Sequence, residues 1–388
     1  MPNRASSHVF AAILVLAIIP FCRLAKAQTG GTDFAVDTVT QLDHQTGAES
    51  ESQTLQSNAS NRDSTSDETS GSGKKAKKWK LKPPKVNGYI QVFYRYAIGT
   101  GTDGIVDNDN FRVQRVRIEF SGKVLPWVSY DVEFDPRAPD ITGILRDAFI
   151  GLDFIPHQEI RIGQQKMPFG YENQASSTEL FAVNRAEVSD NLSRGVNLRD
   201  IGIGLVGKVP LGKCWRIEDA IAVSNGAGLN VQNDNTPRKN VFGRAGLRYK
   251  KGDFWTGLGV SGAEGDFMDS LDLIDFRRYG ADLEIEHQWF FIASEFVFGQ
   301  DKTNGALDEI PGFYINLVGK TPWPAGPIIR FDLLGDSFER WTFGAYYGRA
   351  SDAFRMLFNY ELRSLFEDAT GHIGRGDDKV YVWAQVKF

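Results

Sequence analysis

The sequence predicts an all-β fold, a transmembrane antiparallel β-barrel that follows an export signal. Three observations support this prediction. The 388-residue chain is rich in Gly (40), Phe (27), Tyr (12) and Trp (8) but contains only 2 Cys. Short segments of alternating apolar and polar residues recur along most of its length, separated by Gly, Asn, Asp and Pro, as is typical of β-strands and turns. The chain ends on an aromatic residue, Phe388, that completes one of these segments.

The composition excludes several other classes. Mean hydropathy is −0.30, and no apolar run beyond residue 30 approaches the ~18–20 residues that a membrane-spanning helix needs. The net charge of −5 argues against a nucleic-acid partner. With 2 Cys and 5 His in the chain, neither a disulfide framework nor a Cys/His zinc centre is expected. We therefore expect no metal, no cofactor and no catalytic residue.

Residues 1–27 have the pattern of a secretory signal peptide. Arg4 gives the amino-terminal region a positive charge, and residues 9–21 form an apolar core. Ala25-Lys26-Ala27 then matches a small-x-small cleavage site. Cleavage after Ala27 would remove Cys22 and leave Cys214 as the single cysteine. The sequence thus predicts an exported protein without an internal disulfide.

Residues 28–85 form a second region, a polar spacer. Its first part is dominated by Ser, Thr, Gln, Asn, Gly and Asp, a composition that cannot bury enough surface to offset ordering and predicts disorder. The segment from Lys74 to Lys85 holds seven Lys. We interpret it as a solvated charge run that keeps the spacer extended. The alternative is contact with an anionic surface, either lipid headgroups or cell-wall polymer.

Residues 86–388 form the expected barrel. Period-two alternation is clearest in five segments, at residues 86–96, 115–121, 127–135, 279–287 and 379–388. Gly202 and Gly204 lie in a similar segment. A helix would have to follow them in a dinucleotide-binding loop, and none is expected, so we interpret these glycines as strand positions beneath neighbouring side chains.

The charges on the polar faces indicate which face of the predicted strands meets water. One predicted strand presents Arg115, Arg117 and Glu119, and the next presents acidic residues at positions 131, 133 and 135. A charge ladder of this kind would be untenable in a packed core. It suits a water-filled lumen whose strands turn their apolar faces to lipid. A secreted soluble β-sandwich remains the alternative, and it predicts solubility without detergent.

The closing segment, residues 380–388, alternates to its last residue. Chain ends usually fray, so an aromatic terminus needs a structural reason. A last strand that pairs with the first would leave no open edge. We therefore predict that Phe388 ends the barrel-closing strand.

Several stretches of the sequence are similar to one known family, the phosphate-selective outer-membrane porins O and P. They are FRVQRVRI at 111–118, YDVEFD at 130–135, LRDAFIG at 145–151 and RIGQQKMPFGYE at 161–172. The Gly-Gln-x-Lys-x-Pro-Phe-Gly-x-Glu core of the last stretch is the most specific. The resemblance is clear over roughly residues 86–250 and looser from 253 to 378, where it is mainly a matter of strand rhythm.

The resemblance implies a 16-stranded barrel in the bacterial outer membrane, surrounded by outer-membrane lipid and assembled as a homotrimer. It implies that the third extracellular loop, here residues 175–197, folds inward to narrow the pore. The implied function is passive diffusion of small hydrophilic solutes, including anions such as phosphate or polyphosphate, with no enzymatic step. Pore-lining and anion-contact candidates are Arg115, Arg117, Arg146, Arg161, Lys166, Arg185 and Arg194.

Two questions stay open at this stage. Residues 86–388 hold 33 Lys and Arg against 41 Asp and Glu, so bulk charge does not predict anion selectivity, and the lumenal cations could instead pair with acidic residues on neighbouring strands. The candidate acidic partners are Glu119, Asp131, Glu133 and Asp147. The other open alternative is a structural barrel that tethers the envelope through its basic amino-terminal segment.

Overall fold

The computed structural model describes residues 82–98, 109–138, 143–192, 199–269, 272–335, 338–364, 366–367, 373–374 and 378–388. The predicted signal peptide, nearly all of the spacer and Arg194 lie outside the described residues. No helix within the described ranges is long and apolar enough to cross a bilayer.

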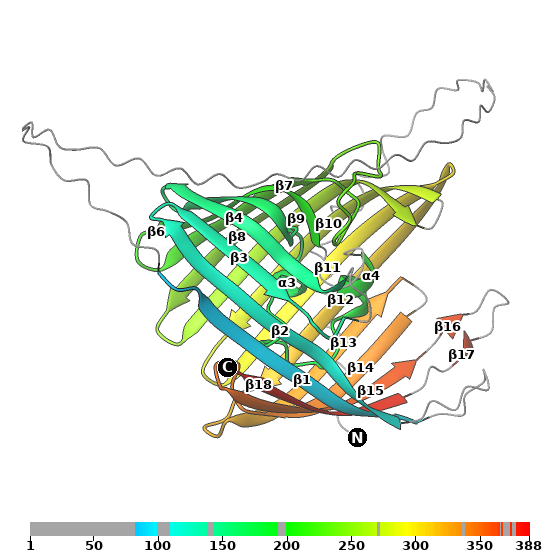
Figure 1. The fold of residues 1–388 in the computed structure, drawn as a ribbon. Helices are drawn as coiled ribbons and strands as arrows, with labels where there is room; N and C mark the ends of the chain where they lie inside the picture. Colours follow the sequence, from blue (N-terminus) through cyan, green and yellow to red (C-terminus); the bar gives the residue numbers. More distant parts are fainter. Residues whose placement is uncertain are drawn as a thin grey trace, which may run out of the picture. The chain divides into compact units, whose positions relative to one another are not determined.

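Sixteen strands of the described chain close into one antiparallel barrel (Figure 1). The first eight are β1 (Lys85–Ile98), β2 (Asp109–Leu125), β3 (Val128–Phe134), β4 (Leu145–Ile155), β5 (Gln158–Lys166), β6 (Arg199–Leu211), β7 (Trp215–Ser224) and β8 (Asn240–Lys251). The other eight are β9 (Phe254–Asp269), β10 (Asp272–Glu286), β11 (Phe290–Thr303), β12 (Ala306–Gly319), β13 (Ala325–Leu334), β14 (Phe338–Tyr347), β15 (Phe354–Ser364) and β18 (Asp378–Lys387). Each strand pairs with the next along the chain, β15 pairs with β18, and β16 (Phe366–Glu367) with β17 (Ile373–Gly374) forms a small separate sheet. The predicted fold class and strand number are confirmed.

The terminal strand closes the barrel as predicted. β18 pairs with β1 in a register that runs from Tyr89 opposite Lys387 to Ile98 opposite Asp378. Beyond this ladder, Gly88 and Phe388 exchange two backbone hydrogen bonds of 2.9 Å. A Cβ at Gly88 would lie 2.5 Å from the Phe388 ring, so the glycine makes room for the terminal aromatic side chain. Closure leaves neither strand with an unpaired edge.

Burial along the strands is the reverse of that in a water-soluble sandwich. Ile90 and Val92 are well exposed on the outer face of β1, while Gln91 between them is completely buried. On β2, Phe111 is 84% exposed, whereas Arg117 is only 5% exposed. Apolar side chains outside and charged side chains inside are what a lipid-embedded barrel requires.

One end of the barrel, here called the short-turn end, carries the tight connections at residues 126–127, 156–157, 212–214 and 252–253. Exposed tryptophans gather at this end, in or beside these turns and the connections at residues 287–289 and 320–324. They are Trp127, Trp215, Trp289 and Trp323. Tryptophan favours the membrane–water boundary because its ring is apolar and its N–H is polar. The short-turn end therefore has the girdle expected at a bilayer surface.

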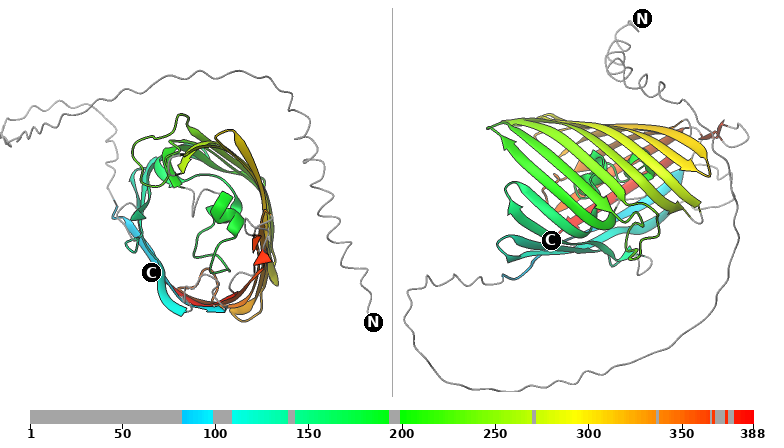
Figure 2. Two further views of the ribbon diagram at one scale, coloured as in Figure 1. Left: turned by 90° about the vertical axis from the view of Figure 1, so that its right-hand side faces the viewer. Right: turned by 90° about the horizontal axis from the view of Figure 1, so that it is seen from above.

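The connection between β5 and β6 runs inside the barrel, and its described part, residues 167–192, is here called the inner segment. It contains two short helices, α3 (Tyr171–Gln174) and α4 (Glu187–Leu192). Figure 2 shows this green segment within the ring of strands. The predicted infolding is confirmed, but it begins at 167 rather than 175. Gly170, with φ of 69°, turns the chain inward, and its N–H donates a 3.1 Å hydrogen bond to Ser261 of β9.

Candidate solute pathway

Arginines of the barrel wall hold the inner segment by its backbone. An irregular segment leaves carbonyls without secondary-structure partners, and each needs a donor when buried. Arg278 of β10 donates to the carbonyl of Leu192 at 2.9 Å. Arg330 and Arg340 donate to those of Asn184 and Arg185 at 2.9 and 2.7 Å. Arg355 of β15 similarly reaches the carbonyl of Leu180 at 3.3 Å. The inner segment is thereby fixed against the wall formed by β10 and β13–β15.

Glu172, the last residue of the family-like motif, is the centre of a buried charge network. It is 2% exposed and accepts a 2.7 Å hydrogen bond from the N–H of Ala186. This bond links the part of the inner segment around α3 to the part that leads into α4. The Glu172 carboxylate also lies 3.1 Å from the guanidinium of Arg330. The network continues from Arg330 to Asp332 at 3.6 Å and from Asp332 to Arg340 at 2.9 Å. Buried charges of this kind need several partners at once, so the network specifies one position for the inner segment.

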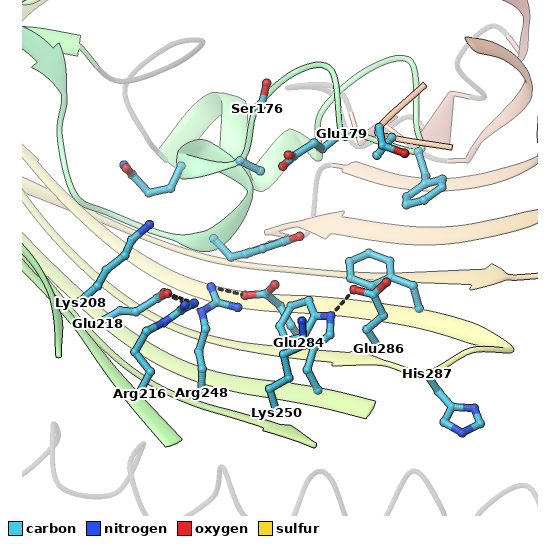
Figure 3. A pocket seen from close by; sticks show the side chains of 18 of the residues that line it. Ser176, Glu179, Lys208, Arg216, Glu218, Arg248, Lys250, Glu284, Glu286 and His287 are labelled. Carbon is cyan, nitrogen blue, oxygen red and sulfur yellow. Dashed lines mark hydrogen bonds and ion pairs between the residues drawn. The ribbon is translucent and has the colours of Figure 1, made fainter. Parts of the chain in front are cut away.

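The space left open lies on the other side of the inner segment. A cavity of about 1320 Å³ lies between the inner segment and the wall around β5–β10, and it reaches the turns at the short-turn end. In Figure 3, Lys208, Arg216, Arg248 and Lys250 project from the wall, facing Ser176 and Glu179 on the inner segment. This cavity is open space at one end of the lumen.

The cavity carries more positive than negative side chains, although the barrel as a whole is acidic. Eight basic residues line it, namely Arg161, Lys208, Arg216, Arg244, Arg248, Lys250, Lys320 and Arg349. Six acidic residues line it, namely Glu179, Glu218, Asp219, Asp253, Glu284 and Glu286. The lining is thus positive by two charges.

Ion pairing neutralises only part of this lining. Arg248 pairs with Glu218 at 2.6 Å and with Glu284 at 2.9 Å. Among the residues that the structure describes, Lys208, Lys250 and Arg349 have no carboxylate within 4.0 Å. These three cations therefore have no ion-pair partner in the described part of the cavity wall.

A second basic cluster lies along β2–β6, where β5 leads into the inner segment. Arg117 pairs with Glu133 at 3.0 Å and with Asp135 at 3.4 Å. Arg199, which the sequence reasoning did not single out, pairs with Asp147 at 2.7 Å and with Glu133 at 3.3 Å. The structure thus gives Arg117 the cross-strand pairing that was the alternative to a free pore-lining role.

The other candidates have different environments. Arg115 donates to Gln91 at 3.0 Å. Lys166 donates to the carbonyls of Gln174 and Ala175 at 3.3 and 3.2 Å. Arg146 is half-buried, and its Nε has no hydrogen-bond partner among the described residues. None of the three has a carboxylate within 4.0 Å in the described part of the chain, so none of them is held there by an ion pair.

The last two candidates in the described residues, Arg161 and Arg185, differ in whether they face the cavity. Arg161 lines the cavity, pairs with Glu159 at 2.6 Å and lies 4.9 Å from the centre of the Phe149 ring. Arg185 is 3% exposed and donates to the carbonyl of Ala175 at 3.2 Å. Arg185 therefore contributes to the packing of the inner segment, whereas Arg161 faces the solute space.

Asp190, on α4, is a titratable group of the inner segment. Burial, with a further contribution from Glu172, raises the pKa of its carboxyl to about 6. Its Oδ1 is buried and has no hydrogen-bond partner in the described residues. Its charge therefore changes in a mildly acidic range.

Sequence reasoning missed the cationic wall of the cavity. Arg244, Arg248 and Lys250 share the lumenal face of β8 because they are separated by even numbers of residues. Their period-two spacing could have identified this basic face from the sequence, but Gly246 takes the position between Arg244 and Arg248 and breaks the run of basic residues. In the described residues, no three His, Cys, Asp or Glu side chains are grouped so as to hold a metal ion.

Comparison with known proteins supports the resemblance. Residues 85–212 match the family described as phosphate-selective porin O and P. This match covers about a third of the chain and includes the strands and motif on which the resemblance depended. No curated protein sequence matches the chain.

Solved structures share the fold at low sequence identity. An anion-selective porin from Comamonas acidovorans is 12% identical, with a TM-score of 0.58 over 79% of this chain and 99% of its own. The outer membrane channel DcaP of Acinetobacter baumannii is 12% identical, with a TM-score of 0.54 over 79% of this chain and 97% of its own. OmpT of Vibrio cholerae in its trimer form is 10% identical, with a TM-score of 0.53 over 79% of this chain and 99% of its own. The chain has the porin fold.

Proposed function

We propose that this protein is a bacterial outer-membrane porin through which small hydrophilic solutes diffuse passively. The observation that carries the proposal is a closed barrel with an apolar outer face and a charged internal cavity beside a fixed inner segment. The family match over residues 85–212 supports it. Diffusion down a gradient needs no catalytic residue, metal or cofactor, and the proposal includes none.

The proposed solutes are preferentially anions, phosphate among them. Selectivity in a channel depends on the charges that line the passage rather than on the net charge of the protein. Lys208, Lys250 and Arg349 line the cavity without carboxylate partners in the described residues, and Arg115 adds positive charge farther along the lumen. A field of this sign concentrates anions and repels cations.

Export and assembly complete the proposal. The signal peptide is cleaved after Ala27, and the mature chain inserts into the outer membrane as a homotrimer. OmpT, one of the structural neighbours, is recorded in a trimer form, which supports this assembly. The seven-residue β3 gives the barrel a low wall on one side, where a neighbouring subunit would supply cover.

The test uses the mature chain, residues 28–388, refolded in detergent and inserted into a planar bilayer under a KCl gradient. We expect conductance steps whose reversal potential lies closer to the equilibrium potential of chloride than to that of potassium. Added phosphate should reduce the current. A K208Q/K250Q double variant should shift the reversal potential toward potassium. K213Q/K251Q is the matched control, because it removes the same charge from two exposed residues at the same end that do not line the cavity, one in the 212–214 turn and one at the end of β8.

Three outcomes would count against the proposal. Cation-selective steps would refute the anion preference. Equal shifts in the two double variants would refute the assignment to the cavity wall. A folded protein that gives no steps would refute the channel and favour an envelope tether.

A further inference from the structure

The cavity has an aromatic face as well as a cationic one. Phe181 of the inner segment, Phe291 of β11 and Tyr346 of β14 all line it. The Phe181 ring lies 5.7 Å from that of Phe291 and 5.3 Å from that of Tyr346, measured between centroids. The lumen of a barrel channel is ordinarily polar, so a patch of three rings in it needs a reason.

Anchoring of the inner segment explains part of this patch. Phe181 and Phe291 pack against a buried cluster that includes Val183, Val318 and Trp383. Anchoring alone would be served best by full burial, as at Val318, which is 2% exposed. Phe181 and Phe291 are instead only half-buried, and the surface they leave open faces the cavity.

A fourth ring lies directly beside a free cation. Trp255 of β9 lines the cavity and is the cross-strand register partner of Lys250 on β8. Its indole N–H donates to Glu286, and the guanidinium of Arg248 lies 5.2 Å from its ring centre. The indole is therefore held in place, while Lys250 has no carboxylate partner in the described residues. Figure 3 shows Lys250 and Lys208 on the same wall.

We propose that the cavity selects aromatic carboxylates over small anions of equal charge. Lys250 would bind the carboxylate, with Lys208 adding positive charge on the same wall, and Trp255 and Phe291 would pack against the ring. A fixed cation next to a fixed aromatic surface matches a planar anion in both charge and shape. This inference rests on the proposed porin function and narrows its solute class.

The experiment compares sodium benzoate with sodium acetate as inhibitors of the chloride current in planar bilayers. Both are monocarboxylates, and only benzoate has a ring. We expect benzoate to halve the current at a concentration about tenfold lower than acetate, the ratio expected from one favourable aromatic contact. Benzyl alcohol, a ring without charge, should leave the current unchanged.

Variants separate the two parts of the site. F291L should reduce the benzoate advantage to about threefold or less without changing inhibition by acetate, since only the ring contact is lost. W255L should reduce the advantage as well, and it also removes the indole hydrogen bond to Glu286. F291Y retains a ring and should retain the advantage, while K250Q should weaken both inhibitors. F242L is the matched control, because Phe242 is a buried lumenal ring in another cluster and does not line the cavity.

The outcomes distinguish this inference from the proposed function. Chloride-conducting channels that benzoate and acetate inhibit equally would overturn the ring site and leave the porin intact. A benzoate advantage that persists in both F291L and W255L would also overturn it. Absence of conductance from folded wild-type protein would remove the porin function and this inference together.

Discussion

Glu172→Gln should release the inner segment from the barrel wall. The carboxylate is 2% exposed, and its partner Arg330 is 1% exposed. Glutamine keeps the size of the side chain but removes the charge that offsets the buried guanidinium. Its amide group also cannot accept hydrogen bonds with both ends, so the N–H of Ala186 or Arg330 loses an acceptor.

The magnitude follows from the burial of the pair. Removing one partner of a buried ion pair costs about 3–5 kcal/mol, because the remaining charge is left uncompensated. Asp332 lies 3.6 Å from Arg330 and takes up part of that charge, so we expect about 3 kcal/mol, at the lower end of this scale. The loss should appear locally, as partial detachment of the inner segment, since the strand ladder of the barrel is unchanged.

The assay is single-channel recording in planar bilayers together with thermal unfolding in detergent. We expect E172Q to give larger and noisier conductance steps and a lower unfolding temperature than wild type. E187Q is the matched control, because Glu187 is on the same segment but, among the described residues, its carboxylate accepts a hydrogen bond from exposed Asn191 alone. Steps of wild-type size and noise, with a stability loss below about 1 kcal/mol, would refute the anchoring role.

Three further predictions test other parts of the molecule. Because the pKa of Asp190 is raised to about 6 from its ordinary value of 3.8, its ionised form destabilises the native state, and this destabilisation is lost as the pH falls below about 6. D190N should therefore stabilise the protein by on the order of 1 kcal/mol at pH 7.5 and not at pH 4; an equal effect in unfolding measurements at both pH values would contradict this. G202A should destabilise β6 by more than 1 kcal/mol by the overpacking scale, because its Cβ would lie 2.2 Å from the carbonyl oxygen of Val223. G262A on β9 has nothing within 4 Å of the new Cβ and should be near neutral, so matching unfolding curves for the two variants would show that the close approach does not matter. Deleting Phe388 removes two backbone hydrogen bonds to Gly88 and should lower the fraction of protein that refolds. Folded barrel can be separated from unfolded chain by electrophoresis of unheated samples, and an unchanged folded fraction in that assay would argue against the closing role of Phe388.

The sequence determined the strands, the direction of their faces and the closure of the barrel. Alternation with period two is a local property, so it identified Arg117 as lumenal and Phe120 as lipid-facing without any knowledge of the neighbours. The terminal Phe388 predicted pairing of the last strand with the first. The family resemblance carried by the motif that ends at Glu172 implied an infolded connection, although not its start. Gly170 turns the chain inward where its N–H donates to Ser261, a residue 91 positions away in the sequence.

The tertiary structure alone decided which charges are neutralised. Arg330 and Glu172 are 158 residues apart and meet only because the inner segment crosses the lumen to β13. Arg117 and Arg185 look equivalent to Arg161 in the sequence, yet both are buried against Glu133 and the inner-segment backbone, while Arg161 pairs with Glu159 and faces the cavity. Pairing inside a barrel depends on strand register and on where the inner segment packs, both of which arise from contacts distant in sequence. For that reason a barrel with an excess of acidic residues encloses a passage with an excess of basic ones.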